Sequence, residues 1–348
     1  MDFWQGSDPQ NYTTSFRGVL GCTQKGEKTV MDKGQRMQAI AITAFGGPDQ
    51  LKLVDLPVPI CGPDQVLINV QAAGVGMWDV KVRQGRVTLE GQQFPLVLGW
   101  ESAGIIEQIG ATVTGLDVGT PVICATYQAG IGHYAHAVAV PADLVAPAPS
   151  NLDVLHAAAL PVNGLTAYQA IYDLLKVQKG ETLLITGAAG GTGTFAVQLA
   201  ARIGAHVIVT ARRENHLYLQ TLGATELIDY TRTDFADVVH AAHPEGIDAV
   251  LDSVGGETAA RSLQLVRERG RLVTIVDLEQ VVPTRHIDTH VLYFRPDRQQ
   301  LAELTKLVDH GQLTVHLDQV FPLEQAKQAH ERLETRHHQG KIVLNMQG

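Results

Sequence analysis

Two different patterns of apolar and polar positions divide the chain. From Met37 to about Pro149 the apolar runs are short and are bounded by glycine and proline, as in QVLINVQAAGV and TPVICAT. Short strands between turn residues are typical of a β-rich domain with Greek-key or barrel character. The pattern therefore predicts such a domain over residues 37–160.

After about Pro161, strand-like runs alternate with segments of helix length. The runs are TLLIT (182–186), HVIVT (206–210), ELIDY (226–230), DAVLD (248–252) and RLVTI (271–275). Nearly continuous apolar strands joined by helices are typical of a parallel sheet covered on both faces. Residues 161–294 are therefore predicted to form an α/β domain with a doubly wound parallel sheet.

Helix signals lie between these strands. Phe195, Gln198 and Leu199 follow the i, i+3, i+4 spacing of one helix face, so a helix is expected from about Thr194. Glycine readily adopts the left-handed conformation found just after a helix. Gly223 and Gly270 are therefore expected to end two further helices.

The two ends of the chain differ from these domains. Residues 1–36 have no sustained period and no apolar core of a secretory signal, so we expect a disordered extension or an upstream start codon. Residues 295–348 are predicted to complete the first domain, because the final strand KIVLN is expected to rejoin it. The other elements predicted in this tail are a helix near 298–309, a strand near 314–320 and a helix near 323–335.

Composition limits the classes of function. Apolar residues make up 45% and charged residues 18% of the 348 positions, which excludes a disordered chain. No run approaches the ~20 apolar residues of a membrane-spanning helix. The 36 acidic and 27 basic residues give a net charge of −9, so we expect neither nucleic acid nor a membrane as a partner.

The cysteines are few and widely separated. Cys22, Cys61 and Cys124 include no CxxC pair, which excludes a disulfide-stapled secreted domain and a four-cysteine zinc site. A reducing compartment fits this usage, and we expect a cytoplasmic protein.

A glycine-rich loop carries the clearest functional signal. The strand TLLIT continues into GAAGGTG at residues 187–193, in which Ala188, Gly190 and Gly193 occupy the three glycine positions of GxGxxG. Such a loop lets the backbone approach a pyrophosphate at a helix N-terminus. The alternative is a glycine-rich connector that binds nothing. The loop residues assigned to the cofactor are Ala189, Gly190, Gly191, Thr192 and Gly193.

The end of the second strand discriminates between cofactors. An NAD site expects an acidic residue about 20 positions after the loop, whereas HVIVT is followed by Ala211-Arg212-Arg213. Guanidinium groups can form paired hydrogen bonds with a 2′-phosphate. The sequence therefore favours NADPH, with Arg212 first and Arg213 second, unless both arginines are solvated surface residues.

Several separated segments resemble the medium-chain dehydrogenase/reductase superfamily, in its zinc-independent quinone oxidoreductase branch. These segments are LGWESAGIIEQIG (98–110), HAAALPVNGLTAYQAI (156–171), GIDAVLDSVGGE (246–257) and FRPDRQQLAEL (294–304). The resemblance covers Met37 to Asn345. It implies a GroES-like domain and a Rossmann domain with the active site in the cleft between them, and a homodimer.

Zinc-dependent members of that superfamily provide a comparison for the metal. Their three catalytic ligands correspond here to Gly76, Trp100 and Asn163, while the glutamate after the second ligand is retained as Glu101. None of the three residues is a usual zinc ligand. We therefore expect no catalytic metal. His133 and His136 do not form a ligand pair either, because residues three apart on a strand face opposite sides.

By similarity, the cofactor contacts extend beyond the glycine loop. The positions that the resemblance implies are Thr166, Tyr230, Val254, Val276 and Phe294. For Tyr230 and Phe294 the alternative is that they are core aromatic residues at strand ends. Many quinone oxidoreductases also carry asparagine and tyrosine where this chain has Gly76 and Lys81, so their substrate contacts do not transfer directly.

These observations favour NADPH-dependent, metal-free hydride transfer to an electrophilic acceptor, such as a quinone or an α,β-unsaturated carbonyl. Asn163 and Tyr127 are candidates for stabilising the acceptor oxygen, with a structural role as the alternative. Met77, Trp78 and Trp100 are candidates for the acceptor pocket. Two other functions stay open: an enoyl-thioester reductase, and a non-catalytic NADPH-binding protein like crystallin relatives.

Overall fold

The computed structural model describes residues 35–89, 91–127, 131–276 and 285–347. From Arg36 onward the chain forms one compact unit. Apart from its last two residues, the extension predicted for residues 1–36 lies outside the described residues. No helix in the described part of the chain is long and apolar enough to cross a membrane.

The N-terminal part of this unit is mainly β-structure, as predicted. The strand β3 is its centre, because β3 pairs antiparallel with β5, β7 and the C-terminal strand. A smaller sheet has the order β2-β1-β4. The strands are β1 (Arg36–Ile42), β2 (Lys52–Pro57), β3 (Gln65–Val75), β4 (Leu96–Val97), β5 (Glu101–Ile109), β6 (Pro121–Ala125), β7 (Ala137–Pro141) and β8 (Val145–Pro147). The helices are α1 (Met77–Arg83) and α2 (Val154–Ala158), with the short turns η2 (Pro48–Gln50) and η3 (Ala142–Leu144).

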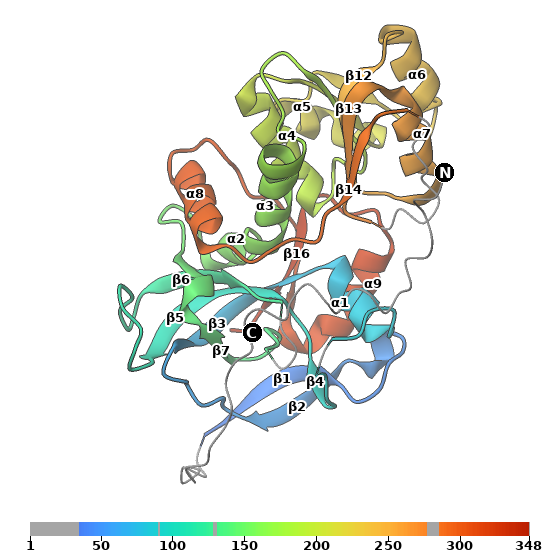
Figure 1. The fold of residues 1–348 in the computed structure, drawn as a ribbon. Helices are drawn as coiled ribbons and strands as arrows, with labels where there is room; N and C mark the ends of the chain where they lie inside the picture. The colour runs from blue at the N-terminus through green and yellow to red at the C-terminus, as the bar shows by residue number, and fades with distance from the viewer. Residues whose placement is uncertain (1–34, 90, 128–130, 277–284, 348) are drawn as a thin grey trace, which may run out of the picture. The chain divides into compact units, whose positions relative to one another are not determined.

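The second part is a parallel sheet with the strand order β11-β10-β9-β12-β13-β14 (Figure 1). This is the order of a doubly wound dinucleotide-binding fold, so the predicted fold class is confirmed. Its strands are β9 (Thr182–Ile185), β10 (His206–Thr210), β11 (Glu226–Ile228), β12 (Ile247–Asp252), β13 (Val266–Thr274) and β14 (Asp288–Val291). Its helices are α3 (Pro161–Tyr168), α4 (Gly191–Ile203), α5 (His216–Thr221), α6 (Phe235–Ala242) and α7 (Gly256–Leu265), with the π-helical turn η4 (Gln169–Leu174) and the 3-10 turn η5 (Arg213–Asn215).

Alternate residues of each central strand pack into different cores. In β9, Leu183 and Ile185 pack in the core that contains α3 and α4, whereas Leu184 packs with Phe235 of α6 and Leu263 of α7. Side chains of a strand alternate between its faces, so both faces of this sheet are covered by helices. The two layers of helices are visible on either side of the strands in Figure 1.

The three predictions for the ends of helices have different outcomes. The helix α4 begins at Gly191, three residues before the predicted start at Thr194, and Gly223 follows α5 with φ +105°, as expected. The prediction for Gly270 is wrong, because this residue lies inside β13. A Cβ atom there would lie 2.4 Å from Cγ1 of Val266, in a region where the β12–β13 register shifts. The glycine therefore serves a close strand contact.

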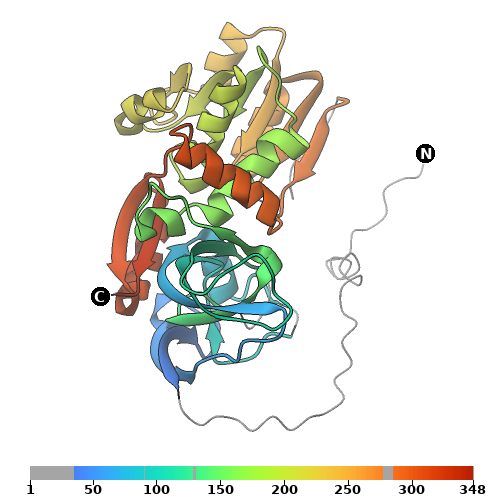
Figure 2. The same ribbon diagram turned by 90° about the vertical axis from the view of Figure 1, so that its left-hand side faces the viewer.

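The C-terminal tail returns to the N-terminal part of the fold. The last strand pairs antiparallel with β3 and parallel with the strand before it, and Figures 1 and 2 show its red ribbon beside the blue-green strands. The domain limits 37–160, 161–294 and 295–348 stay predictions. The elements of the tail are α8 (Arg298–Asp309), β15 (Leu317–Pro322), η6 (Leu323–Gln325), α9 (Ala326–Glu334) and β16 (Lys341–Asn345).

Two histidines are fully buried in the N-terminal part of the fold and in α9. Nδ1 of His133 lies 2.8 Å from Oγ of Ser102, and its Nε2 lies 2.9 Å from Oγ1 of Thr126. Nδ1 of His330 lies 3.2 Å from a guanidinium nitrogen of Arg83. Burial disfavours the charged imidazolium and lowers the pKa of each histidine to about 3, with Arg83 adding to the effect at His330.

We predict that acid destabilises the protein through these histidines. The ordinary pKa is 6.5, so between pH 6.5 and about 3 the unfolded chain binds protons that the folded chain does not. The free energy of unfolding is therefore highest above pH 6.5 and decreases as the pH falls. Urea denaturation at several pH values should show a smaller decrease for His133→Gln than for the wild type. His286→Gln, at an exposed position, is the control, and an unchanged slope in His133→Gln would contradict the assignment.

Candidate functional site

The glycine-rich loop joins the end of β9 to α4. Gly190 precedes the helix in an extended conformation. A Cβ atom on Gly193 would lie 2.5 Å from the carbonyl oxygen of Ala188, so this glycine allows α4 to pack closely on the loop. A Cβ atom on Gly191 would lie 2.1 Å from Nδ2 of Asn163, so Gly191 accommodates a side chain from α3. The buried N-terminus of a 13-residue helix offers backbone N–H groups to an anion.

The segment before β16 lies against this loop. The N–H of Gly340 donates to the carbonyl oxygen of Ala189 at 2.8 Å, and Gly190 and Gly340 form an isolated parallel bridge. The buried Nδ1 of His338 has no hydrogen-bond partner among the described residues. The C-terminal tail therefore contributes side chains to the surroundings of the glycine loop, although it lies about 150 residues further along the chain.

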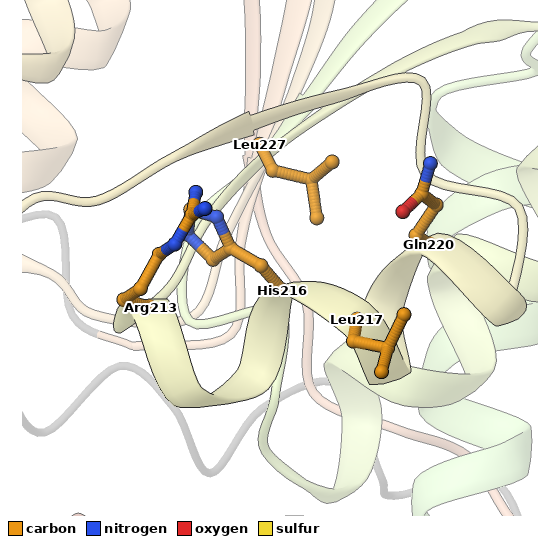
Figure 3. A pocket seen from close by; sticks show the side chains of 5 residues that line it. All are labelled: Arg213, His216, Leu217, Gln220 and Leu227. Atoms are coloured by element: carbon orange, nitrogen blue, oxygen red, sulfur yellow. The ribbon is translucent and has the colours of Figure 1, made fainter.

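The two arginines after β10 lie in different surroundings. A guanidinium nitrogen of Arg212 lies 2.8 Å from Nε2 of His337 in the same tail segment. The buried Nε of Arg212 has no partner among the described residues. Arg213 instead faces a shallow pocket beside α5, shown in Figure 3. That pocket is lined by Arg213, His216, Leu217, Gln220 and Leu227.

Asp252 organises the carboxyl ends of three strands. Its fully buried carboxylate accepts hydrogen bonds from Oγ1 of Thr186 at 2.7 Å and Oγ1 of Thr274 at 2.8 Å. The same carboxylate accepts from the backbone N–H groups of Val254 at 3.2 Å and Gly255 at 2.9 Å. These bonds fix the turns after β9, β12 and β13 at the edge where doubly wound sheets bind their ligands.

The remaining predicted cofactor positions lie on the same edge or on α3. Val254 and Val276 follow β12 and β13, and the backbone N–H of Val276 is held by Oγ1 of Thr274. Tyr230 follows β11 and is 48% exposed, which argues against the core-aromatic alternative. Oγ1 of Thr166 donates to the carbonyl oxygen of Val162 at 2.6 Å within α3.

A buried ion pair connects the N-terminal sheet, the tail and the glycine loop. Nζ of Lys341 lies 2.5 Å from Oε1 of Glu101, and the two side chains are 4% and 2% exposed. The other oxygen of Glu101 accepts from the N–H of Val162 at 2.7 Å. Lys341 also donates to Oδ1 of Asn163 at 2.7 Å, and Nδ2 of Asn163 donates to Oγ1 of Thr192 at 3.2 Å. Asn163 thus lies between this pair and α4.

Aromatic rings from three segments lie around Tyr127. Its ring centroid lies 5.6 Å from that of Trp78, 6.3 Å from Trp100 and 5.9 Å from Phe294. Trp78 also lies 6.4 Å from Tyr293. These spacings are typical of packed aromatic pairs. The fold therefore brings together four residues that the sequence analysis named as site candidates: Trp78, Trp100, Tyr127 and Phe294.

Polar atoms of this aromatic cluster are available for a ligand. The indole Nε1 atoms of Trp78 and Trp100 are buried and have no partner among the described residues. A buried donor without a partner is unfavourable unless a ligand or water accepts its hydrogen bond. Burial, with a smaller effect of Tyr293, raises the pKa of the Tyr127 phenol, so it stays protonated at neutral pH. Met77 is half-buried beside Trp78 and packs on the N-terminal core.

The residues at the three positions that the sequence resemblance assigns to a catalytic zinc are not suited to bind a metal. Gly76 has no side chain, and its N–H donates to Oδ2 of Asp79 at 2.8 Å. Trp100 offers only an indole N–H group, and the Asn163 amide is hydrogen-bonded to Lys341 and Thr192.

The carboxyl group of Asp79, which accepts from Gly76, is fully buried. Burial raises the pKa of Asp79 to about 6, and hydrogen bonds from backbone N–H groups partly offset that effect.

His133 and His136 have separate partners. His133 is enclosed by Ser102 and Thr126, whereas Nε2 of His136 lies 3.1 Å from the carbonyl oxygen of Met346.

Four residues of this site were not predicted as site residues from the sequence: Lys341, Asp252, His337 and Tyr293. Lys341 had a signal, because a lysine begins the otherwise apolar run KIVLN. Asp252 also had one, since it ends the apolar run DAVLD at the carboxyl edge. The position of His337 depends on the return of the tail, which no local pattern specifies.

Comparison with known proteins identifies relatives across the whole fold. Residues 62–150 match the family model described as alcohol dehydrogenase GroES-like domain, and residues 222–344 match that of zinc-binding dehydrogenase. The 2-haloacrylate reductase of a Burkholderia species is 32% identical over 331 residues, covering 88% of this chain and 98% of that protein. The quinone oxidoreductase of Mus musculus is 30% identical over 320 residues, covering 86% and 95%.

A solved structure supports the same relationship. The quinone oxidoreductase from Coxiella burnetii is 33% identical and superimposes with a TM-score of 0.83. The match covers 90% of this chain and 100% of that chain. The sequence identity and the similarity of the two folds both indicate that the two proteins are related.

We predict that Lys341→Met is strongly destabilising, because it leaves Glu101 charged and buried without its partner. Loss of one member of a buried pair costs about 3–5 kcal/mol. The double variant Lys341→Met/Glu101→Gln should lose much less than the sum of the two single variants, as measured by urea denaturation in a double-mutant cycle. Lys306→Met, which breaks an exposed pair with Glu303, is the control and should leave the midpoint nearly unchanged. Additive single effects would contradict a coupled pair.

Proposed function

Because the chain belongs to the medium-chain dehydrogenase/reductase superfamily and is an oxidoreductase by that relationship, we propose that it is an NADPH-dependent quinone or enone reductase that works without a catalytic metal. The observation that carries the proposal is the aromatic cluster around Tyr127, with two buried indole N–H groups that have no partner in the described part of the chain. Such a surface suits a flat acceptor that is already electrophilic. The acceptor therefore needs orientation more than it needs a Lewis acid.

The glycine loop and Arg212 support NADPH as the cofactor. The N-terminus of α4 is proposed to bind the pyrophosphate through Ala189, Gly190, Gly191, Thr192 and Gly193. The guanidinium of Arg212 is proposed to bind the 2′-phosphate, with Arg213 as the secondary residue and Tyr230 at the adenosine phosphate. The guanidinium of Arg212 donates to Nε2 of His337, so this imidazole helps to orient the arginine. Thr166, Val254, Val276 and Phe294 are proposed to contact the rest of the cofactor.

Bound NADPH would supply the hydride, and the protein residues would orient and stabilise the acceptor. Trp78, Trp100 and Met77 would hold its flat face in a pocket with little water. The protonated phenol of Tyr127 is proposed to donate to the oxygen on which negative charge develops. The amide of Asn163 has two N–H bonds, of which Thr192 accepts one, so the other can serve the same oxygen.

The proposed absence of a catalytic metal rests on the donor set. Gly76, Trp100 and Asn163 offer no usual zinc ligand, although one matching family model is described as zinc-binding. Glu101, retained from the metal-dependent pattern, is neutralised by Lys341. The lysine ammonium group already neutralises this carboxylate, so Glu101 offers no free anionic ligand to a metal ion.

We predict that Arg212→Asp weakens NADPH binding far more than NADH binding. The variant replaces a cation with an anion, which repels the 2′-phosphate that only NADPH carries. Fluorescence titration should show NADPH affinity reduced by at least about tenfold, as expected for the loss of about 1.4 kcal/mol or more. Arg213→Asp is the matched control and should have the smaller effect. Equal losses for both cofactors in Arg212→Asp would exclude the phosphate role.

We predict NADPH oxidation by the purified chain with quinones, enals or enones, and no loss of turnover after chelation with EDTA. A steady-state screen that also includes enoyl-thioesters distinguishes the candidate functions. Preference for enoyl-thioesters would favour the enoyl-thioester reductase, and tight NADPH binding without oxidation by any acceptor would favour the non-catalytic protein. Activity that disappears with EDTA and returns with Zn²⁺ would contradict the metal-free mechanism.

A further inference from the structure

Two histidines and a glutamate meet at the edge of the parallel sheet opposite the glycine loop. His206 and Glu226 are the first residues of β10 and β11, and His243 directly follows α6. Nε2 of His206 and Nε2 of His243 lie 2.5 and 3.2 Å from the same oxygen, Oε1 of Glu226. Of the residues that the structure describes, these three form the group in which potential metal-ligand atoms all lie within 4.8 Å of one another.

The fold explains why these side chains converge. The strands β10 and β11 are parallel, with Glu226 opposite Ile208, and His206 points to the same face as Ile208 because side chains alternate along a strand. Ile208 packs against Val239 of α6 in the core on that face. His243 lies one helical turn after Val239, and its N–H donates to the carbonyl oxygen of Val239 at 2.8 Å. Regular structure therefore fixes all three backbone positions.

The chemistry of the donors suits a transition-metal ion. Imidazole nitrogen and carboxylate oxygen bind Zn²⁺ at about 2.0–2.2 Å, which separates neighbouring ligand atoms by about 3.4 Å in a tetrahedron. The observed separations of 2.5 and 3.2 Å from the shared oxygen need only small side-chain rotations to reach it. The three side chains are 35%, 32% and 22% exposed, so water can complete the coordination and ions can enter.

We propose that His206, Glu226 and His243 bind one divalent metal ion of the zinc type. The ion replaces the two N–H···O contacts by three metal–ligand bonds and joins β10, β11 and the end of α6. The site lies at the amino ends of the strands, away from the glycine loop at the carboxyl ends, so its role is structural. It is independent of the proposed reductase function. The sequence does not predict it, because the glutamate lies 20 and 17 residues from the two histidines, without a ligand motif.

The test uses the full-length chain after removal of metal by a chelator. Calorimetric titration with Zn²⁺ should give one ion per chain. His243→Ala or His206→Ala should weaken the affinity by at least about 100-fold, because each removes a ligand, and loss of a residue that only hydrogen-bonds a ligand already costs up to about 100-fold. His240→Ala is the matched control, because His240 lies in the last turn of α6, just before His243, and is exposed. It should retain the wild-type affinity.

Two further readouts separate this site from other metal binding. Co²⁺ should give visible bands of a nitrogen and oxygen site without the thiolate charge-transfer band expected for Cys22, Cys61 or Cys124. Saturating Zn²⁺ should raise the Tm of the wild type and of His240→Ala but not that of His243→Ala. Glu226→Gln, which preserves the side-chain shape, provides a second variant if the histidine variants are poorly folded. No stoichiometric binding, a thiolate band, or equal affinities in wild type and all site variants would overturn the proposal.

Discussion

The buried ion pair between Lys341 and Glu101 is the interaction on which the geometry of the candidate site depends. Both charges are almost completely removed from water, so each is tolerated only while the other is in place. Glu101 holds the start of α3 through the N–H of Val162, and Lys341 holds Asn163 against Thr192 at the start of α4. The pair therefore connects a strand of the N-terminal sheet, the last strand of the chain and the helix that begins at the glycine loop.

A second buried carboxylate, that of Asp252, is also stabilised by hydrogen-bond partners near the proposed cofactor site. Asp252 uses both carboxylate oxygens to hold Thr186, Thr274 and the turn after β12. Among the described residues, the buried donors without a partner include Nε1 of Trp78 and Nε of Arg212, two residues that are proposed to contact ligands. A buried donor without a partner is favourable only when a ligand or water accepts from it, so these two donors support the proposed binding site.

Local patterns were sufficient for the parallel sheet and for the unit of strand, glycine-rich loop and helix, because β9, the loop and α4 are consecutive in sequence. They were insufficient where distant segments meet. His337 beside Arg212 and Lys341 beside Glu101 depend on the return of the tail to the N-terminal sheet, and the histidines around Glu226 depend on the β10–β11 register. Gly270 misled the prediction, since a close strand contact requires glycine as strongly as a helix end does.

We infer that bound NADPH extends from Arg212 to the aromatic cluster around Tyr127. A crystal structure of the complex with NADP⁺ tests it most directly. We predict that the 2′-phosphate lies within hydrogen-bonding distance of the Arg212 guanidinium, and that the nicotinamide ring faces Tyr127 and Trp78. A 2′-phosphate directed away from Arg212, or a nicotinamide ring outside the aromatic cluster, would contradict this placement of the cofactor.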